Sequence, residues 1–89
     1  MVSYYRTVWE GIGADDGHYY AEVKSGEIVR QIVAIGDVLY WATLHECSNE
    51  LYDFTDQPEV SEEELEGFEE ISVSDFESLW LRAKVEGCR

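Results

Sequence analysis

The first half of the chain is divided by short turn sequences into four segments that suit β-strands. The segments are rich in β-branched and aromatic residues, which pack well on a pleated sheet. They cover residues 3–10, 18–25, 27–35 and 38–46. Ser25-Gly26 and Gly36-Asp37 are two-residue connections of the kind that closes tight hairpins, and the glycine-rich segment 11–18 is a longer connection. Four successive strands joined in this way predict an antiparallel meander over about residues 3–46.

Alternation along the third segment predicts how its two faces are used. In a regular strand, Ile28, Arg30 and Ile32 share one face. Arg30 would then meet Glu22 of the neighbouring strand. We interpret this pair as a cross-strand salt bridge rather than as catalytic side chains, because opposite charges commonly pair across neighbouring strands.

The clearest helix signal lies near the end of the chain, over residues 74–86. Apolar residues recur there at the i, i+3, i+4, i+7 spacing of an amphipathic helix. They are Phe76, Leu79, Trp80 and Ala83. Ser74 and Glu77 have the spacing of a capping box, which predicts that the helix starts at this serine. One helix packed on one face of the meander predicts an α+β domain.

Residues 47–73 are interpreted as an acidic connection between the sheet and the helix. Ser61 and Glu64 form a second capping box, so a short acidic helical turn is expected there, and Gly67 is placed to end it. A chain of 89 residues with one sheet and one long helix is expected to form a single domain, 1–89.

The charge of the chain is strongly negative and unevenly placed. The net charge is −14, and the interval 31–81 contains 14 acidic residues without a single lysine or arginine. A field of this sign repels nucleic acids and anionic membranes, so neither is an expected direct partner, and it attracts basic proteins. We therefore expect a basic protein partner, with a solvated surface as the alternative explanation of the glutamates.

The candidate partner-binding residues are all acidic and lie between the predicted sheet and helix. They are Asp53, Asp56, Glu62, Glu63, Glu66, Glu69 and Glu70. A second hypothesis concerns the aromatic residues of the sheet. Because one helix covers only one face, Tyr20 and Tyr40 are candidates for an exposed aromatic surface, which would serve a homodimer.

No catalytic residue, metal ligand or cofactor is predicted. His18 and His45 lack the spacing of a zinc site, and the acidic residues lack the spacing of a calcium loop. Cys47 and Cys88 are expected to be reduced thiols, with a bridge between them left open. The N-terminal sequence has neither a signal peptide nor a membrane-spanning run, so a cytoplasmic location is expected.

The order of these features resembles a family of small acidic bacterial domains of unknown function. Members of that family combine a tyrosine-rich meander with a C-terminal helix of the pattern Phe-Glu-x-x-Trp. The matching pieces here are Tyr4 to Trp9, Tyr20 to Glu22, Arg30 to Ile32, Gly36 to Ala42, and Glu70 through Ala83. The chain departs from the pattern by one extra residue after Ser72. The resemblance implies the meander-plus-helix fold and no particular activity.

These features favour a non-enzymatic, acidic protein-binding domain. By analogy with immunity proteins of similar size and acidity, an inhibitor of a basic partner such as a nuclease is the most concrete expectation. The alternative is a homodimerising module that uses an aromatic sheet face.

Overall fold

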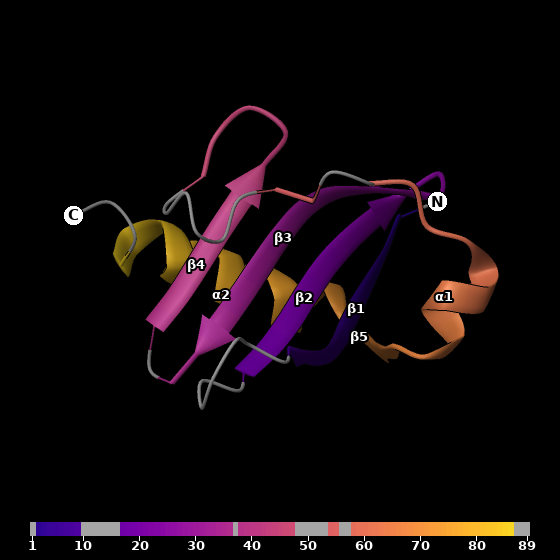
Figure 1. The fold of residues 1–89 in the computed structure, drawn as a ribbon. Coiled ribbons are helices and arrows are strands. Elements are labelled where there is room, and N and C mark those ends of the chain that lie inside the picture. The colour runs from indigo at the N-terminus through magenta and orange to yellow at the C-terminus, as the bar shows by residue number, and fades with distance from the viewer. Residues whose placement is uncertain (1, 10–16, 37, 48–53, 56–57, 87–89) are drawn as a thin grey trace.

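Five antiparallel strands form one sheet in the computed structural model of the chain, which describes residues 2–9, 17–36, 38–47, 54–55 and 58–86 (Figure 1). The strands are β1 (Val2–Trp9), β2 (Gly17–Lys24), β3 (Glu27–Ile35), β4 (Val38–Thr43) and β5 (Glu69–Ile71), in the spatial order β4-β3-β2-β1-β5. Two helices, α1 (Glu62–Glu66) and α2 (Val73–Glu86), complete the described elements. The predicted meander, the C-terminal helix and the α+β class are confirmed.

Strand β5 was not predicted and lies within the segment interpreted as a connection. It pairs antiparallel with β1, with Tyr4 opposite Ile71, Tyr5 opposite Glu70 and Arg6 opposite Glu69. The strand has three residues and two of them are glutamates, so neither length nor alternation identifies it in the sequence. Glutamates on an edge strand also oppose the pairing of another chain at that edge.

A β-bulge changes the faces of β3 from those predicted. Glu22 lies opposite Arg30, but the next residue, Val23, lies opposite Ile28, so Val29 is the extra residue. The bulge breaks the alternation and places Ile28 on the same face as Val23. The prediction that Ile28 shares a face with Arg30 and Ile32 is therefore wrong.

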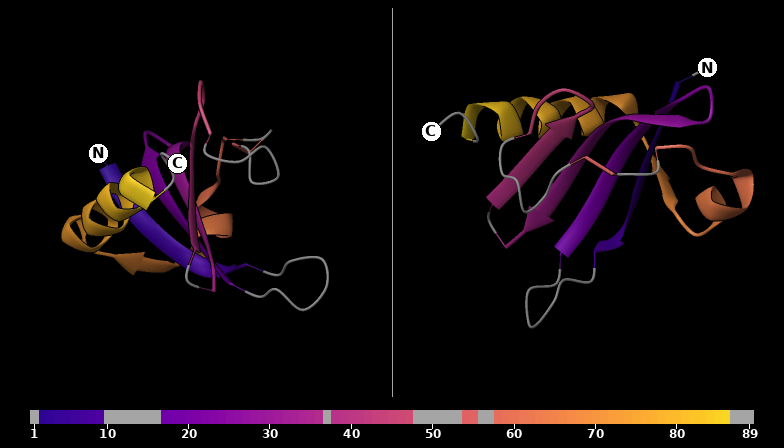
Figure 2. Two further views of the ribbon diagram at one scale, coloured as in Figure 1. Left: turned by 90° about the vertical axis from the view of Figure 1, so that its left-hand side faces the viewer. Right: turned by 45° about the horizontal axis from the view of Figure 1, so that its top comes forward.

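Helix α2 covers one face of the sheet, as Figure 2 shows from the side. The buried residues between them are Ile32, Leu39, Trp41, Phe76 and Ala83. Phe76 and Ala83 come from the predicted apolar stripe of the helix, and both are fully buried. Leu79 and Trp80, the other two members of that stripe, pack against the same cluster. The stripe therefore attaches the helix to the sheet as its spacing predicts.

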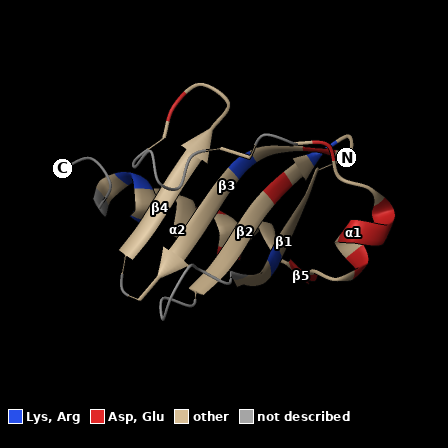
Figure 3. Cartoon of the chain, in the orientation of Figure 1, with Lys and Arg blue, Asp and Glu red and all other residues tan. Residues whose placement is uncertain are grey.

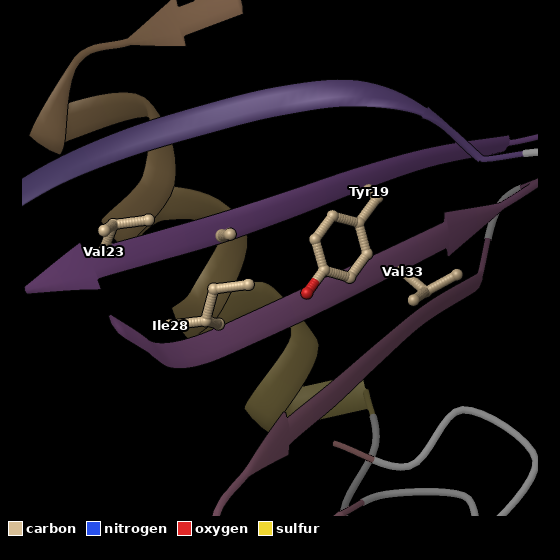
Figure 4. Close-up of a cluster of buried hydrophobic side chains, with 5 residues drawn as sticks. Tyr19, Val23, Ile28 and Val33 are labelled. Carbon is tan, nitrogen blue, oxygen red and sulfur yellow. The ribbon is translucent and has the colours of Figure 1, made fainter. Parts of the chain in front are cut away.

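The opposite face of the sheet is covered by the segment between β4 and β5. Its buried residues are Tyr19, Ala21, Val23, Ile28 and Val33, and four of them are labelled in Figure 4. Four apolar side chains from that segment and from α1 pack against them, namely Phe54, Val60, Leu65 and Phe68. This face is thus covered without a second long helix, contrary to the expectation that one helix would leave it open.

Gln31 fixes part of this covering segment to the sheet. Its side chain is 3% exposed, and its Oε1 accepts hydrogen bonds from the Tyr19 hydroxyl and the Thr55 backbone N–H, both at 3.1 Å. Burial raises the pKa of Tyr19 to about 12, so its hydroxyl remains a donor at neutral pH. A buried amide satisfied in this way joins β2, β3 and the covering segment.

The two helices begin at serines. The Ser61 side chain accepts a hydrogen bond from the Glu64 N–H at 3.2 Å, and the short acidic helix ends at Gly67, both as predicted. Helix α2 begins one residue earlier than predicted, because Ser72 and not Ser74 caps it: Ser72 Oγ accepts from the Asp75 N–H at 3.1 Å. Neither described helix combines the length and the apolar character that a bilayer crossing requires.

Candidate protein-binding surface

The glutamates of α1 and β5 gather at one end of the molecule, beyond the β1 side of the sheet (Figure 3). We call this region the acidic end and define it by Glu62, Glu63, Glu64, Glu66, Glu69 and Glu70. All six are exposed. Strand β5 and helix α1 contain no lysine or arginine, so nothing within these two elements offsets their charge.

The predicted acidic residues are only partly brought together. Glu62, Glu63 and Glu66 lie on α1, whereas Glu69 and Glu70 are successive residues of β5 and point to opposite faces of the sheet. Glu70 lies on the same face of the sheet as α1, because Tyr5, its partner on β1, contacts the Phe68 ring and packs against the same core cluster as Leu65. The candidates Asp53 and Asp56 lie outside the described residues.

Among the described residues, Glu69 is the glutamate of the acidic end for which an ion pair is present. Arg6, directly opposite on β1, donates a hydrogen bond to Glu69 Oε2 and forms an ion pair with it. This hydrogen bond raises the pKa of Arg6. Both side chains are solvent-exposed, so a partner could compete with Arg6 for Glu69. The ion pair nevertheless reduces the contribution of Glu69 to the negative potential of the acidic end.

The Arg30 guanidinium is engaged on the far side of the sheet, under α2. Its Nε and Nη2 donate to the two carboxylate oxygens of Glu22 at 2.6 and 2.7 Å, and Nη2 also donates to Glu77 of α2. The guanidinium carbon lies 5.1 Å from the Phe76 ring centre and 4.9 Å from that of Trp80. The predicted cross-strand pair of Glu22 and Arg30 is confirmed, and it extends to the helix.

The ionisation of this cluster follows from its hydrogen bonds. The Arg30 donors hold the pKa of Glu22 below its ordinary value, and the Glu22 acceptors raise the pKa of Arg30. Burial, together with the neighbouring Glu22 carboxylate, raises the pKa of Tyr4. Glu22 is therefore ionised at neutral pH and cannot act there as a general acid; the arrangement joins α2 to the sheet.

Lys84 is a second cation held at the interface of α2 and the sheet. Its Nζ lies 3.7 Å from the centre of the Trp41 ring and 5.9 Å from that of Trp80. The two indole rings meet edge to face, with centres 5.8 Å apart. Arg30 and Lys84 are thus engaged at the α2 side of the sheet, and the cation that pairs with the acidic end is Arg6, at Glu69.

The two tyrosines proposed as one aromatic surface lie on opposite faces of the sheet. Tyr20 is opposite Ile32 and packs into the cluster under α2, whereas Tyr40 is opposite Val33 and packs into the other cluster. Both side chains are half-buried. They cannot contribute to the same contact with a flat partner, because the sheet separates them.

A shallow depression adjoins α1 and was not predicted from the sequence. It has a volume of about 330 Å³ and lies between the start of β1, the β2–β3 turn and α1. Its lining residues are Ser3, Tyr5, Val23, Ser25, Gly26, Val60, Glu62 and Leu65. These residues come from several separate segments, and the alternation that puts Ser3 and Tyr5 on one face is the only sequence signal for it.

Within the described part of the chain, no three His, Cys, Asp or Glu side chains are grouped as a metal site requires. Cys47 is a free, half-buried thiol, and Cys88 lies outside the described residues. In comparisons with known proteins, no family model, curated protein or solved structure matches the chain.

Proposed function

We propose that this protein is a non-enzymatic binding domain whose acidic end docks a basic protein. An inhibitor of the immunity type, acting on a basic partner such as a nuclease, is the most concrete form of this proposal. The observation that carries it is the separation of charge. Six exposed glutamates, of which Glu69 is paired with Arg6, lie on α1 and β5, whereas Arg30 and Lys84 are held between α2 and the sheet.

Such a separation suits recognition by electrostatics. A one-sign surface steers an oppositely charged partner and raises the association rate, and this effect weakens as salt is added. The acidic end also stands on fixed structure, because α1 is capped by Ser61 and Leu65 packs against the sheet core. The carboxylates of α1 are therefore held on a packed helix rather than on an unattached segment.

The test is capture from an extract of the source cells on the immobilised protein, with elution by a salt gradient and identification by mass spectrometry. We expect a basic protein to be released at moderate salt. A variant with Glu62, Glu63, Glu66, Glu69 and Glu70 replaced by glutamine should lose that protein. Equal retention by both proteins would contradict the role of the acidic end.

A second candidate function is self-association through the edge of β4. This strand has the sequence VLYWAT, without a charged residue, and it forms the end of the described sheet farthest from the acidic end; the backbone of Ala42 and Thr43 at its end already pairs with Cys47 and Glu46. Val38 on the strand and Leu44 just after it are 48% and 71% exposed. Pairing of two β4 edges would keep the two acidic ends far apart.

The effect of salt on binding distinguishes the two candidate functions. Binding of a basic partner weakens as salt is added, whereas a dimer of two strongly acidic chains becomes stronger, because salt screens their mutual repulsion. Sedimentation of the purified protein at low and high salt measures the second effect. A monomer under all conditions would remove this candidate.

A further inference from the structure

The depression beside α1 combines an apolar interior with a charged rim. Tyr5 and Val23 of the sheet form its floor, and Val60 and Leu65 of the covering segment form its walls. Val23 is only 5% exposed, so the floor belongs to the core. A volume of about 330 Å³ would hold several water molecules, at roughly 30 Å³ each, and so has room for one long side chain.

The rim of the depression is negative and polar. Glu62 supplies an exposed carboxylate, and Ser3 and Ser25 add hydroxyl groups that can accept hydrogen bonds. None of its described lining residues is a lysine or arginine. Lys24, which follows Val23 on β2, and Arg6, which follows Tyr5 on β1, both point to the other face of the sheet.

The wall of the depression that carries Val60 is attached to the start of β3. Glu27 and Glu59 are bridge partners, and both are exposed. Their segments are held together by two backbone hydrogen bonds, from the Val60 N–H to the Gly26 oxygen at 2.9 Å and from the Ile28 N–H to the Pro58 oxygen at 2.7 Å. The wall that carries Val60 is thus fixed to the β2–β3 turn.

We propose that this depression receives one lysine or arginine side chain of the basic partner. The aliphatic stem of that side chain would lie on Tyr5, Val23, Val60 and Leu65, and its charged group would reach Glu62 at the rim. Lysine and arginine bury their stems along apolar surfaces and keep the charged head among polar groups, which is the chemistry that this depression offers. The inference rests on the proposed function. It identifies the depression beside α1 as the place where the acidic end anchors the partner.

The test adds hexalysine, as the probe, to the ¹⁵N-labelled protein at low salt. Binding is measured from the changes in the amide chemical shifts. We expect the largest shifts at the lining residues of the depression. The variant Glu62→Gln should weaken binding about three- to fivefold, the upper range for one exposed charge pair. The matched control Glu63→Gln removes the same charge from the same turn of α1, outside the lining residues, and should weaken binding less.

A second pair of variants tests the apolar interior without changing any charge. Ser3→Leu places an aliphatic side chain in the depression and should reduce hexalysine binding. Thr7→Leu makes a similar change on the same strand and the same face, at a separate depression lined by Arg6 and Glu69, and should weaken binding less. Ser3 and Thr7 are both partly buried and lie opposite the buried Val23 and Tyr19, so the two changes are matched in their surroundings.

The outcomes distinguish the two proposals. Binding with equal effects of Glu62→Gln and Glu63→Gln, and with shifts spread along α1, would overturn the anchor and leave the acidic end as a general cation-binding surface. No hexalysine binding at low salt would overturn both. Localised shifts together with a selective loss in Glu62→Gln and Ser3→Leu would support the anchor.

Discussion

At the scale of single residues, Arg30 makes the most consequential contacts of the described chain. It forms a bidentate hydrogen-bonded pair with Glu22 on the next strand, contacts Glu77 on α2, and packs against Phe76 and Trp80. The side chains of Arg30 and Glu22 are only 21% and 12% exposed. A charged pair shielded to this degree matters more for stability than the exposed pairs of the surface.

Replacement of Arg30 by methionine should therefore destabilise the fold. Methionine keeps an unbranched stem over the aromatic rings but leaves the Glu22 carboxylate without its two donors. We expect a loss of about 2–3 kcal/mol in the free energy of unfolding, measured with urea. The control Glu77→Gln removes only the half-exposed contact and should cost less than about 1 kcal/mol. Equal costs would show that the Glu22 pair is not the stabilising part.

The same pair predicts a pH dependence. The folded pKa of Glu22 lies below its ordinary value of 4.5, so the folded state favours the ionised carboxylate. Its contribution to stability is present at neutral pH and is lost as the pH falls below about 4.5 towards the folded pKa. The free energy of unfolding of the wild type should exceed that of Glu22→Gln by less at about pH 3 than at about pH 7. An advantage that stays constant over this range would contradict the prediction.

At the scale of secondary structure elements, two serines near the start of α2 have different roles. Ser72 accepts the hydrogen bond of the Asp75 N–H, whereas Ser74 lies inside the helix and is exposed. The cap decides where the helix begins and how its apolar stripe meets the sheet. Val73 and Ser74, which separate Ser72 from Asp75, belong to the first turn of the helix.

Removal of each serine tests this arrangement. Ser72→Ala should lower the free energy of unfolding by about 1 kcal/mol, the usual cost of a lost N-cap. Ser74→Ala should be neutral or slightly stabilising, because alanine has the higher helix propensity. Thermal unfolding followed by circular dichroism measures both. A larger loss of stability for Ser74→Ala than for Ser72→Ala would show that Ser74 caps the helix, as the sequence predicts.

The elements with a regular period could be predicted from the sequence. The four strands of the meander, α1, and the apolar stripe of α2 all follow patterns that depend on neighbouring residues alone. The bulge at Val29 could not be predicted, because an extra residue in one strand is visible only against its partner. Strand β5 is specified by its contact with β1, and its own three residues carry no strand signal.

The same limit applies to the candidate site. The concentration of glutamates is evident in the sequence, but their distribution between α1 and the two faces of β5 depends on the pairing with Arg6 and Tyr5. The covering of the second face by Phe54, Val60 and Leu65 arises from long-range packing. The depression beside α1 results from that packing, and the aromatic surface expected of Tyr20 and Tyr40 is divided by the sheet for the same reason.

At the scale of the whole molecule, charge is the dominant property. A net charge of −14 on 89 residues places like charges close together in the compact state. Figure 3 shows the strongest concentration of acidic residues on α1, away from the basic residues of α2. Self-repulsion of this kind favours a binding partner of opposite sign and lowers the stability of the isolated chain.

Salt should therefore stabilise the isolated protein. An increase from about 20 mM to about 500 mM sodium chloride shortens the screening length several-fold and reduces the repulsion among the glutamates. We expect the melting temperature to rise by a few degrees, since about 1 kcal/mol corresponds to roughly 4–8 °C in a domain of this size. A fall in the melting temperature would show that attractive surface pairs, such as Arg6 with Glu69, outweigh the repulsion.

The most direct test of the central claim compares two variants of equal net charge in binding to the captured basic partner. Glu63→Gln with Glu66→Gln removes two charges from the acidic end, and Glu46→Gln with Asp75→Asn removes two exposed charges elsewhere. The dissociation constant should increase for the first pair, by about tenfold if each contact contributes roughly 0.7 kcal/mol, and should barely change for the second. Equal weakening by both pairs would show that only net charge matters and would contradict a binding surface at α1 and β5.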